Sequence, residues 1–417
     1  MRTGRSRGAA ITALAAFLAR VAGAGAQEIV ELPGEDRRLE ADFEEVYRVG
    51  AADGEEWEMF SEIVNPGFDA SGNLYLFDRR ASRIVVVDPS GQLLREFGRE
   101  GDGPGEFRSA LAMAVMRDGR VVVGDAEHRA YLIFDANGEF ERHVRMDADA
   151  GHVVVPWMWP GPGGESVIVG TRNAGSFTVH SEGASPEIGR PPASRPIQRL
   201  ILTGEGMTRE PVAEGWAPPR TASAVGEGYS RRGFEPELHV GVLPGGMVAY
   251  SDSSAYAIKI ASRETGISRI LTRPVSPAPV TERMKQAERD RRQESLDEFL
   301  GGFGIAGVDI AGSGIREGRL EAIRALEFFE EIPVIRYLMT SWNGTIWVQR
   351  SGDGPRASGP IDVLTPDGCY VGSYPTGATG LPRAFGPGGL AAFVERDALD
   401  VQTVVVRRVP LHETLCR

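Results

Sequence analysis

The sequence predicts an all-β fold, a six-bladed β-propeller of four-stranded antiparallel blades, and two observations support this prediction. The stretch from Gly67 to Met146 repeats itself at an offset of 47 residues without a gap. Within each repeat, turns that contain Gly or Asn recur about every ten residues between β-forming runs, which is typical of an antiparallel meander. Four-stranded sheets that repeat with a period of about 40 to 50 residues pack radially into a propeller.

The repeat is clearest at glycines and aspartates. Four pairs of positions keep their residue type across the offset: Gly72 and Gly119, Asp78 and Asp125, Asp88 and Asp135, Gly91 and Gly138. The runs 74–77, 84–87 and 131–134 are apolar throughout, without polar alternation. Such strands are buried on both faces, which a small sheet achieves when it lies between copies of itself. We therefore expect a closed ring.

The remaining blades follow in order along the chain. Blade one lies at about 60–98 and blade two at 109–146, and blade three is less regular. Its four strands are expected at Val153–Trp159, Glu165–Gly170, Ser176–His180 and Pro186–Arg190. Residues 191–234, rich in Pro, Gly and Arg, are interpreted as a long excursion with a short strand at Ile197–Thr203. Blade four follows at 237–272 and blade five at 334–374.

The last blade lacks a strand of its own. Residues 381–409 supply three strands, whereas Phe43–Val49 reads as a strand with no hairpin partner. We expect Phe43–Val49 to be the outer strand of the last blade, because this pairing joins the two ends of the ring and removes an open sheet edge.

One helical insert is expected between blades four and five, at residues 281–331. Acidic and basic residues are spaced for i,i+4 pairing in 281–299, and 316–331 places Leu320, Ile323 and Leu326 on one face. A helical hairpin that covers one blade edge is the interpretation we favour. A module for binding a partner protein is the alternative.

The N-terminus has the pattern of a secretory signal peptide. Three arginines precede an apolar run at 9–19, and Ala24-Gly25-Ala26 offers a cleavage site. We therefore expect a signal peptide at 1–26, a linker at 27–42, a propeller at 43–410 and a tail at 411–417. The mature protein is expected to be periplasmic or secreted, without a transmembrane span, and monomeric. An uncleaved anchor is the alternative.

Charge and cysteine content restrict the possible partners. The chain has a net charge of −12, and removal of residues 1–26 takes away four arginines and no acid, which gives −16. An acidic protein is disfavoured as a ligand of nucleic acid or of anionic membranes. The two cysteines, Cys369 and Cys416, are candidates for a disulfide in an exported protein. Two cysteines are too few for a Cys-rich zinc site.

The chain resembles a known family at the motifs just described. The loop Gly98–Phe107 (GREGDGPGEF) and the two cassettes of Asp-Gly turn, strand and Asp resemble the NHL-type six-bladed β-propellers of the TolB-like superfamily, specifically the bacterial exported "6-bladed β-propeller" proteins. The resemblance is specific over residues 60–146 and weaker from there to Val409. It implies an exported, non-catalytic ligand- or protein-binding or scaffold protein.

Several motifs have two interpretations. The G-x-x-G-x-G pattern in Gly98–Phe107 is expected to link blades, because a phosphate-binding loop would lead into a helix and this one leads into a strand. Asp78, Asp125 and Asp252 recur where second strands end. We expect each of them to bond the backbone of its own turn; a ring of carboxylates that binds calcium is the weaker alternative. No cofactor is predicted.

Loops at one mouth of the channel are the expected ligand site. This mouth is formed by the loops between second and third strands and by the loops between blades, and it would display Arg79, Arg80, His128, Arg129, Trp157, Trp159 and Arg350. Arginine beside aromatic residues suits an acidic, sugar or peptide ligand. A solvated loop rim would contain the same residues, so the alternative stays open.

Two functions are compatible with the sequence. The first is the non-catalytic binding or scaffold protein that the resemblance implies. The second is a lactonase-like hydrolase or lyase with a metal in the central channel. The six histidines show no metal-binding spacing and there is no G-x-S-x-G motif, so no catalytic residue is assigned. Several carboxylates or histidines converging at one mouth would favour the enzyme.

Overall fold

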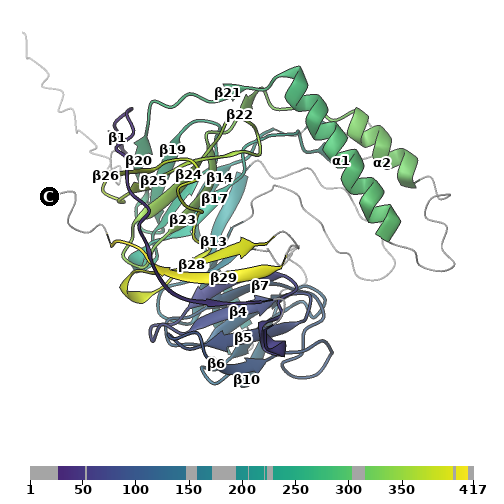
Figure 1. The fold of residues 1–417 in the computed structure, drawn as a ribbon, viewed down its shortest axis with the longest axis vertical. Coiled ribbons are helices and arrows are strands. Elements are labelled where there is room, and N and C mark those ends of the chain that lie inside the picture. The colour runs from purple at the N-terminus through teal and green to yellow at the C-terminus, as the bar shows by residue number, and fades with distance from the viewer. Residues whose placement is uncertain are drawn as a thin grey trace, which may run out of the picture.

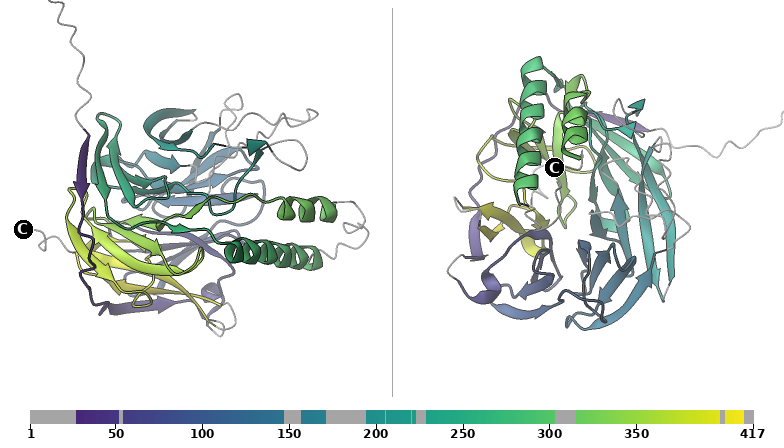
Figure 2. Two further views of the ribbon diagram at one scale, coloured as in Figure 1. Left: turned by 90° about the horizontal axis from the view of Figure 1, so that it is seen from above. Right: turned by 90° about the vertical axis from the view of Figure 1, so that its right-hand side faces the viewer.

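The computed structural model describes residues 27–51, 54–146, 157–170, 194–204, 206–219, 221–222, 229–302, 315–397 and 401–411. Six four-stranded sheets are arranged in a ring (Figure 1; Figure 2, right), as the sequence predicts. In each blade the first strand is innermost, and the four strands pair antiparallel; a fifth strand from the N-terminal region joins blade four in parallel. No helix among the described residues is both long and apolar enough to cross a bilayer.

Blades one and two lie within their predicted ranges, and their corresponding strands have nearly identical lengths. Blade one consists of β3 (Ile63–Phe68), β4 (Leu74–Asp78), β5 (Arg83–Val87) and β6 (Leu93–Phe97). Blade two consists of β7 (Ala110–Val115), β8 (Val121–Asp125), β9 (Ala130–Phe134) and β10 (Phe140–Arg145). The middle strands are buried on both faces. Between the two blades, Phe107 meets Phe77 and Phe134 edge to face, with ring centroids 6.0 and 5.9 Å apart.

Blade three differs from the prediction. Its strands are β11 (Met158–Pro160), β12 (Ser166–Gly170), β13 (Ser194–Thr203) and β14 (Gly206–Trp216). The strand expected at Ile197–Thr203 lies within β13, but the interpretation of 191–234 as an excursion outside the blade is wrong, because β13 and β14 form the outer hairpin of blade three. The predicted strands Ser176–His180 and Pro186–Arg190 lie outside the described residues. Pro211 was misleading: it lies in the edge strand β14, where a missing backbone N–H is tolerated.

Blades four and five match the predicted order. Blade four consists of β17 (His239–Val242), β18 (Val248–Ser251), β19 (Ala257–Ser262) and β20 (Gly266–Thr272). Blade five consists of β23 (Ile335–Thr340), β24 (Ile346–Ser351), β25 (Ser358–Leu364) and β26 (Tyr370–Tyr374). Short 3-10 turns at Pro244–Gly246 and Pro387–Gly389 connect first to second strands in blades four and six, and a third 3-10 turn lies at Glu56–Glu58.

The ends of the chain meet in blade six. It consists of β27 (Ala384–Phe385), β28 (Leu390–Arg396), β29 (Gln402–Arg408) and, from the N-terminal region, β2 (Glu44–Val49). Strand β2 pairs antiparallel with β29 from Glu44 opposite Arg408 to Val49 opposite Val404. The predicted closure of the ring by an N-terminal strand is confirmed.

The segment before β2 adds a feature that the sequence did not reveal. We call residues 28–43 the N-terminal strap. Within it, β1 (Glu28–Glu31) pairs in parallel with β20 as a fifth strand of blade four, and Arg38 forms a parallel bridge to Ser373 of blade five. The strap then continues into β2 of blade six, so that it ties three consecutive blades together (Figure 1).

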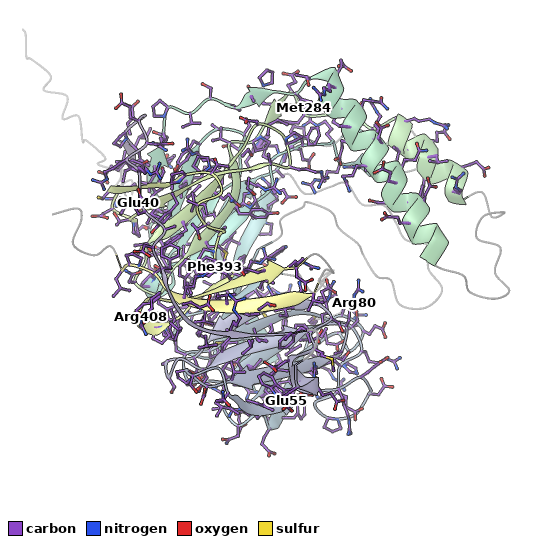
Figure 3. The ribbon with its side chains drawn as sticks, in the orientation of Figure 1. Glu40, Glu55, Arg80, Met284, Phe393 and Arg408 are labelled. Carbon is purple, nitrogen blue, oxygen red and sulfur yellow. The ribbon has the colours of Figure 1, made fainter. Side chains whose placement is uncertain are left out.

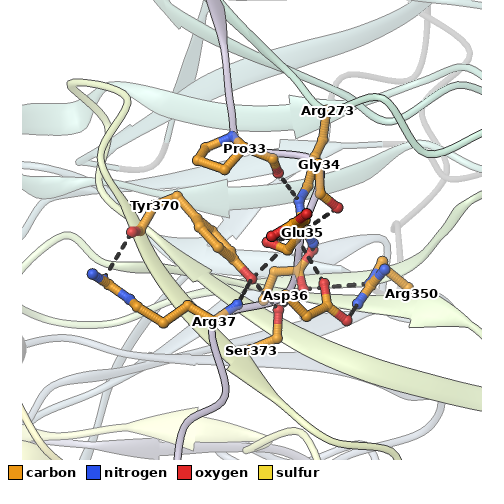
Figure 4. Close-up of polar contacts among 10 residues, drawn as sticks. Pro33, Gly34, Glu35, Asp36, Arg37, Arg273, Arg350, Tyr370 and Ser373 are labelled. Carbon is orange, nitrogen blue, oxygen red and sulfur yellow. Dashed lines mark hydrogen bonds and ion pairs between the residues drawn. The ribbon is translucent and has the colours of Figure 1, made fainter.

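Between β1 and β2 the strap is bound by a network of arginines (Figure 4). Arg273, which follows β20, donates to the carbonyl oxygens of Pro33 at 2.7 Å and Glu35 at 2.9 Å and pairs with Asp36 at 2.7 Å. Arg350 donates to Asp36 at 2.6 Å. The strap is therefore fixed by side chains of blades four and five as well as by β pairing.

Two helices form the predicted insert between blades four and five: α1 (Glu282–Gly302) and α2 (Ile315–Arg324). They project from one side of the ring instead of lying along the edge of a blade (Figure 1; Figure 2, left). The short strands β21 (Ala278–Pro279) and β22 (Glu331–Ile332) pair at their base, and a second small hairpin is formed by β15 (Thr221–Ala222) and β16 (Tyr229–Ser230). Phe328 contacts Phe234 with ring centroids 5.4 Å apart, so the base packs on the segment that precedes blade four.

Glu288 anchors α1 to the ring. Its carboxylate, whose side chain is only 3% exposed, binds Arg291 and Arg292 of the same helix and Arg356 of blade five at 2.8 to 3.0 Å. Burial raises the pKa of this carboxyl, but the hydrogen bonds from the three arginines outweigh burial and lower the pKa to about 2.

We expect Glu288→Gln to loosen the insert at neutral pH. Because the pKa is lowered in the folded protein, the stabilisation is fully present above the ordinary value of 4.5 and is lost as the pH falls toward about 2. At pH 7 the variant should lose roughly 1–3 kcal/mol of local stability, measured as faster hydrogen exchange in 282–298. The hydrogen-exchange rates of wild type and variant should converge to equal values near pH 2, as the Glu288 carboxylate becomes protonated. Equal exchange rates at pH 7 would contradict the anchoring role.

Candidate ligand-binding channel

A channel of about 1120 Å³ runs through the centre of the ring. It is lined mainly by the first strands of the blades and the residues beside them. Three of the six tryptophans of the chain line it, Trp157, Trp159 and Trp342, together with Tyr337. Four methionines also contribute: Met113, Met116, Met158 and Met339. The wall is therefore rich in large, polarizable side chains.

The channel has two different ends. The turn end is formed by the turns between first and second strands, such as 117–118, 160–164 and 244–246. The loop end is formed by the connections between blades and by the loops between second and third strands. The helical insert is itself a connection between blades, so α1 and α2 stand at the loop end (Figure 2, right).

Asp78 and Asp125 fix the entry of the chain into each first strand. The Asp78 carboxylate accepts hydrogen bonds from the backbone N–H groups of Ser61 at 3.1 Å and Glu62 at 2.9 Å. The equivalent Asp125 accepts from the N–H groups of Arg108 at 2.8 Å and Ser109 at 3.2 Å. Both carboxylates are fully buried, so these bonds satisfy groups that water does not reach. The role is structural, but the bonded backbone differs from the prediction. These bonds of Asp78 go to the segment before the first strand and not to its own turn, whereas Asp125 also accepts from the N–H of His128 in its own turn at 3.0 Å.

Asp252 is engaged in a different way. It accepts from the backbone N–H of Trp216 at 2.7 Å and pairs with Lys259 at 2.7 Å, which joins the outer strand of blade three to blade four. Across the described ranges, no group of three or more His, Cys, Asp or Glu side chains is placed to hold a metal ion. The calcium alternative for Asp78, Asp125 and Asp252 therefore gains no support from the geometry.

Of the seven residues expected at the mouth, Trp157 and Trp159 line the channel. Trp159 also packs against the apolar core between blades three and four. Arg350 instead binds Asp36 of the strap and lies 3.4 Å from the buried Asp362. Its side chain is thus part of the network that fixes the strap.

The other four predicted residues form local contacts in blades one and two. Arg79 pairs with Glu62 at 2.6 Å, and Arg80, 76% exposed, lies 3.5 Å from the same carboxylate (Figure 3). His128 lies 3.4 Å from Asp125. Arg129 has a positive φ of 49° in a turn, where its carbonyl accepts from the N–H of Met146. None of the four is among the residues that line the channel.

Asn65 is a channel residue that the sequence analysis missed. It lines the channel in a bulge of β3, between Val64 and Gly67, and has a φ of 44°. A non-glycine residue in this region is uncommon and is found preferentially at functional sites. The signal was present in the sequence, because Pro66 inside a strand indicates a bulge.

Arg117 and Trp342 form a contact across the turn end. The guanidinium carbon of Arg117, in the first turn of blade two, lies 4.6 Å from the ring centroid of Trp342 in blade five. Blades two and five are three positions apart in a ring of six, so they lie on opposite sides of the channel. No local pattern could indicate this pair, because its members are more than 200 residues apart.

The carboxylates that line the channel are paired. Glu62 binds Arg79, as described, and Asp118 binds Arg120 at 2.8 Å. Burial raises the pKa of Asp118, but the hydrogen bond from Arg120 and its charge outweigh burial, and the pKa lies below its ordinary value. Asp118 is therefore ionised at neutral pH, and each of the two lining acids has an arginine partner.

Solved structures with a similar fold include three of interest. A Bacteroides fragilis protein named as exported has 10% identity and a TM-score of 0.49, with 92% of this chain and 100% of that chain covered. A member of the DUF4221 family from Bacteroides vulgatus has 9% identity and a TM-score of 0.48, with 89% and 99% covered. The third is a catalytically inactive virginiamycin B lyase from Staphylococcus aureus with quinupristin, at 9% identity and a TM-score of 0.39, with 88% of each chain covered.

The likeness to these structures concerns the fold and does not extend to activity. No protein-family model matches the chain, and no curated protein matches it. The predicted partner of Cys369, Cys416, lies outside the described residues, so this disulfide stays a prediction.

Proposed function

We propose that the protein is an exported, non-catalytic binding protein of the NHL type that holds its ligand in the central channel. One observation supports this most directly: half of the tryptophans of the chain line a cavity of about 1120 Å³. The signal-peptide pattern of residues 1–26 supports export to the periplasm or beyond. The repeat over residues 60–146 and the loop Gly98–Phe107 support the NHL assignment.

The size and chemistry of the channel suit a ligand of substantial size. Ligand cavities commonly measure about 300–1,000 Å³ and combine apolar walls with a few polar groups. Tryptophan offers a large, rigid face at a low cost in side-chain entropy, and it is enriched among residues that dominate binding energy. An oligosaccharide, a short peptide or an organic acid with a ring would fit these properties.

The carboxylates support binding over catalysis. Asp78 and Asp125 are occupied by backbone N–H groups, and Asp252 by a backbone N–H and a lysine. A lactonase-like enzyme would need several ligands that converge on one metal ion, and the described residues show no such group. Elemental analysis of the mature protein before and after dialysis against EDTA tests the alternative. One calcium or zinc ion held per chain would favour the enzyme.

Ligand binding should be detected by titration of the purified mature protein. We expect at least one of three probes, chitotetraose, trialanine or 2-naphthoate, to change the tryptophan fluorescence in a saturable way. Trp157→Ala should weaken that binding at least about tenfold, since a tryptophan at the centre of a site is often worth 2 kcal/mol or more.

Trp216→Ala is the matched control. Trp216 is 42% exposed and does not line the channel, and its backbone bonds to Asp252 and Arg195 survive the substitution. Binding by the control should equal that of wild type. Absence of binding to all three probes, or equal binding by Trp157→Ala and wild type, would contradict ligand binding in the channel.

A further inference from the structure

We propose that the ligand of the channel is an organic carboxylate with an aromatic or apolar body, which is attracted by the positive charges of two lining residues, Arg383 and Arg117. This inference rests on the proposed function and specifies its ligand class. It depends on the charges that line the channel and on which of them have partners.

Acidic side chains do not give the channel a negative character. The two lining carboxylates described above, Glu62 and Asp118, each have an arginine within 2.8 Å. Those arginines, Arg79 and Arg120, do not line the channel themselves. Each lining carboxylate is nevertheless neutralised by the guanidinium that it contacts directly.

Arg383 is a lining cation that has no acidic partner among the described residues. It directly precedes β27, is exposed, and lines the channel. Its backbone N–H donates to Ala392, but its guanidinium forms no hydrogen bond or ion pair with the described part of the chain. Arg396, which also lines the channel, has interactions of its own and is not needed for the proposal.

Arg117 is the second lining cation, and it lies at the turn end of the channel. It is exposed, and among the described side chains its contact is with the face of Trp342, with no carboxylate partner. A guanidinium stacked on an aromatic ring keeps its N–H groups in the plane available for a carboxylate. Trp342 offers a flat apolar surface beside that charge.

The sign of this charge is opposite to that of the whole protein. With a net charge of −12, the chain has an excess of acids over bases, yet Arg383 and Arg117, which have no acidic partner in the described part of the chain, both line the cavity. A low-dielectric cleft with charges of one sign concentrates ligands of the opposite sign. Tryptophan and methionine side chains along the same wall accommodate an apolar body. Together these features select an amphipathic anion.

Calorimetric titration with matched probes tests the inference. 2-Naphthoate carries the anion, and 2-naphthamide is its neutral analogue of nearly equal shape. We expect naphthoate to bind wild type at least about tenfold more tightly than the amide, since hydrogen bonds to charged groups are worth about 1.5–3 kcal/mol. Arg383→Gln and Arg117→Gln should each weaken naphthoate binding about tenfold and leave amide binding unchanged.

Arg145→Gln is the matched control for loss of one positive charge. Arg145 is exposed on β10, the outermost strand of blade two, and does not line the channel. The Arg145→Gln variant should bind naphthoate as tightly as wild type. A loss of affinity equal to that of the channel variants would indicate a general charge effect and overturn the assignment of Arg383 and Arg117. 2-Naphthyl phosphate serves as a third probe, and binding more than tenfold tighter than naphthoate would overturn the carboxylate class.

Failure of the inference can be distinguished from failure of the proposed function. Equal affinity for naphthoate and naphthamide, still sensitive to Trp157→Ala, would overturn the anionic ligand and leave channel binding intact. Binding of chitotetraose or trialanine without binding of naphthoate would also overturn the anionic ligand and leave channel binding intact. No binding by any probe would overturn both.

Discussion

A chain that begins at Gly50 is expected to fail to form a stable ring, whereas a chain that begins at Gln27 should fold. Without β2, blade six has three strands, and β29 is left as an open edge from Val404 to Arg408. Tyr47 and Val49, which are buried between blades six and one, are lost as well. We expect aggregation, or a melting temperature lowered by more than about 10 °C. Size-exclusion chromatography and circular dichroism measure both.

A third chain that begins at Phe43 separates closure of the ring from the effect of the strap. It keeps β2 but lacks β1 and the bridge to Ser373. We expect it to fold with reduced stability, between the other two chains. If the chain from Gly50 melted like the chain from Gln27, the role of β2 in closing the ring would be refuted.

The fold was predictable because the pattern of one four-stranded blade recurs along the chain. Strands β4, β5, β8 and β9 are buried on both faces, and this burial requires neighbouring copies. The unpaired strand before Gly50 could be assigned to blade six because that blade lacked one. Blade three was harder to interpret, since its outer hairpin contains Pro196, Pro211 and several arginines that suggest a loop. Tertiary pairing of β13 with β12 overrides that local signal.

The site was predictable only where a large aromatic residue lies on a first strand or directly before it, as for Trp159 and Trp157. For charged residues in loops, side-chain direction depends on partners that are distant in sequence. Arg350 turns toward Asp36, which is 314 residues away, and Arg117 contacts a tryptophan of the opposite blade. Local propensity contains no information on such partners. The strap was missed for the same reason, because Arg273 and Arg350 lie far from it along the chain.

Arg273→Met is the substitution for which we expect the largest loss of stability. The Arg273 side chain is fully buried, pairs with the fully buried Asp362 at 3.1 Å, and lies 4.4 Å from the centroid of the Tyr370 ring. Methionine has a similar length but no charge. The buried carboxylate of Asp362 would then keep a single cationic neighbour among the described residues, Arg350 at 3.4 Å. Removal of one partner of a buried ion pair typically costs about 3–5 kcal/mol. Chemical denaturation should show this loss.

Two further variants separate buried charge from the general loss of an arginine. Arg269 lies on β20, is partly exposed and pairs with Glu28 of β1. We expect Arg269→Met to lower the free energy of unfolding by less than about 1 kcal/mol. The double variant Arg273→Met with Asp362→Asn should be less unstable than the sum of its single variants, because the unpaired carboxylate is then gone. If Arg273→Met cost no more than Arg269→Met, the strap would be held by β pairing and apolar contacts, and the arginine network would contribute little to the folded state.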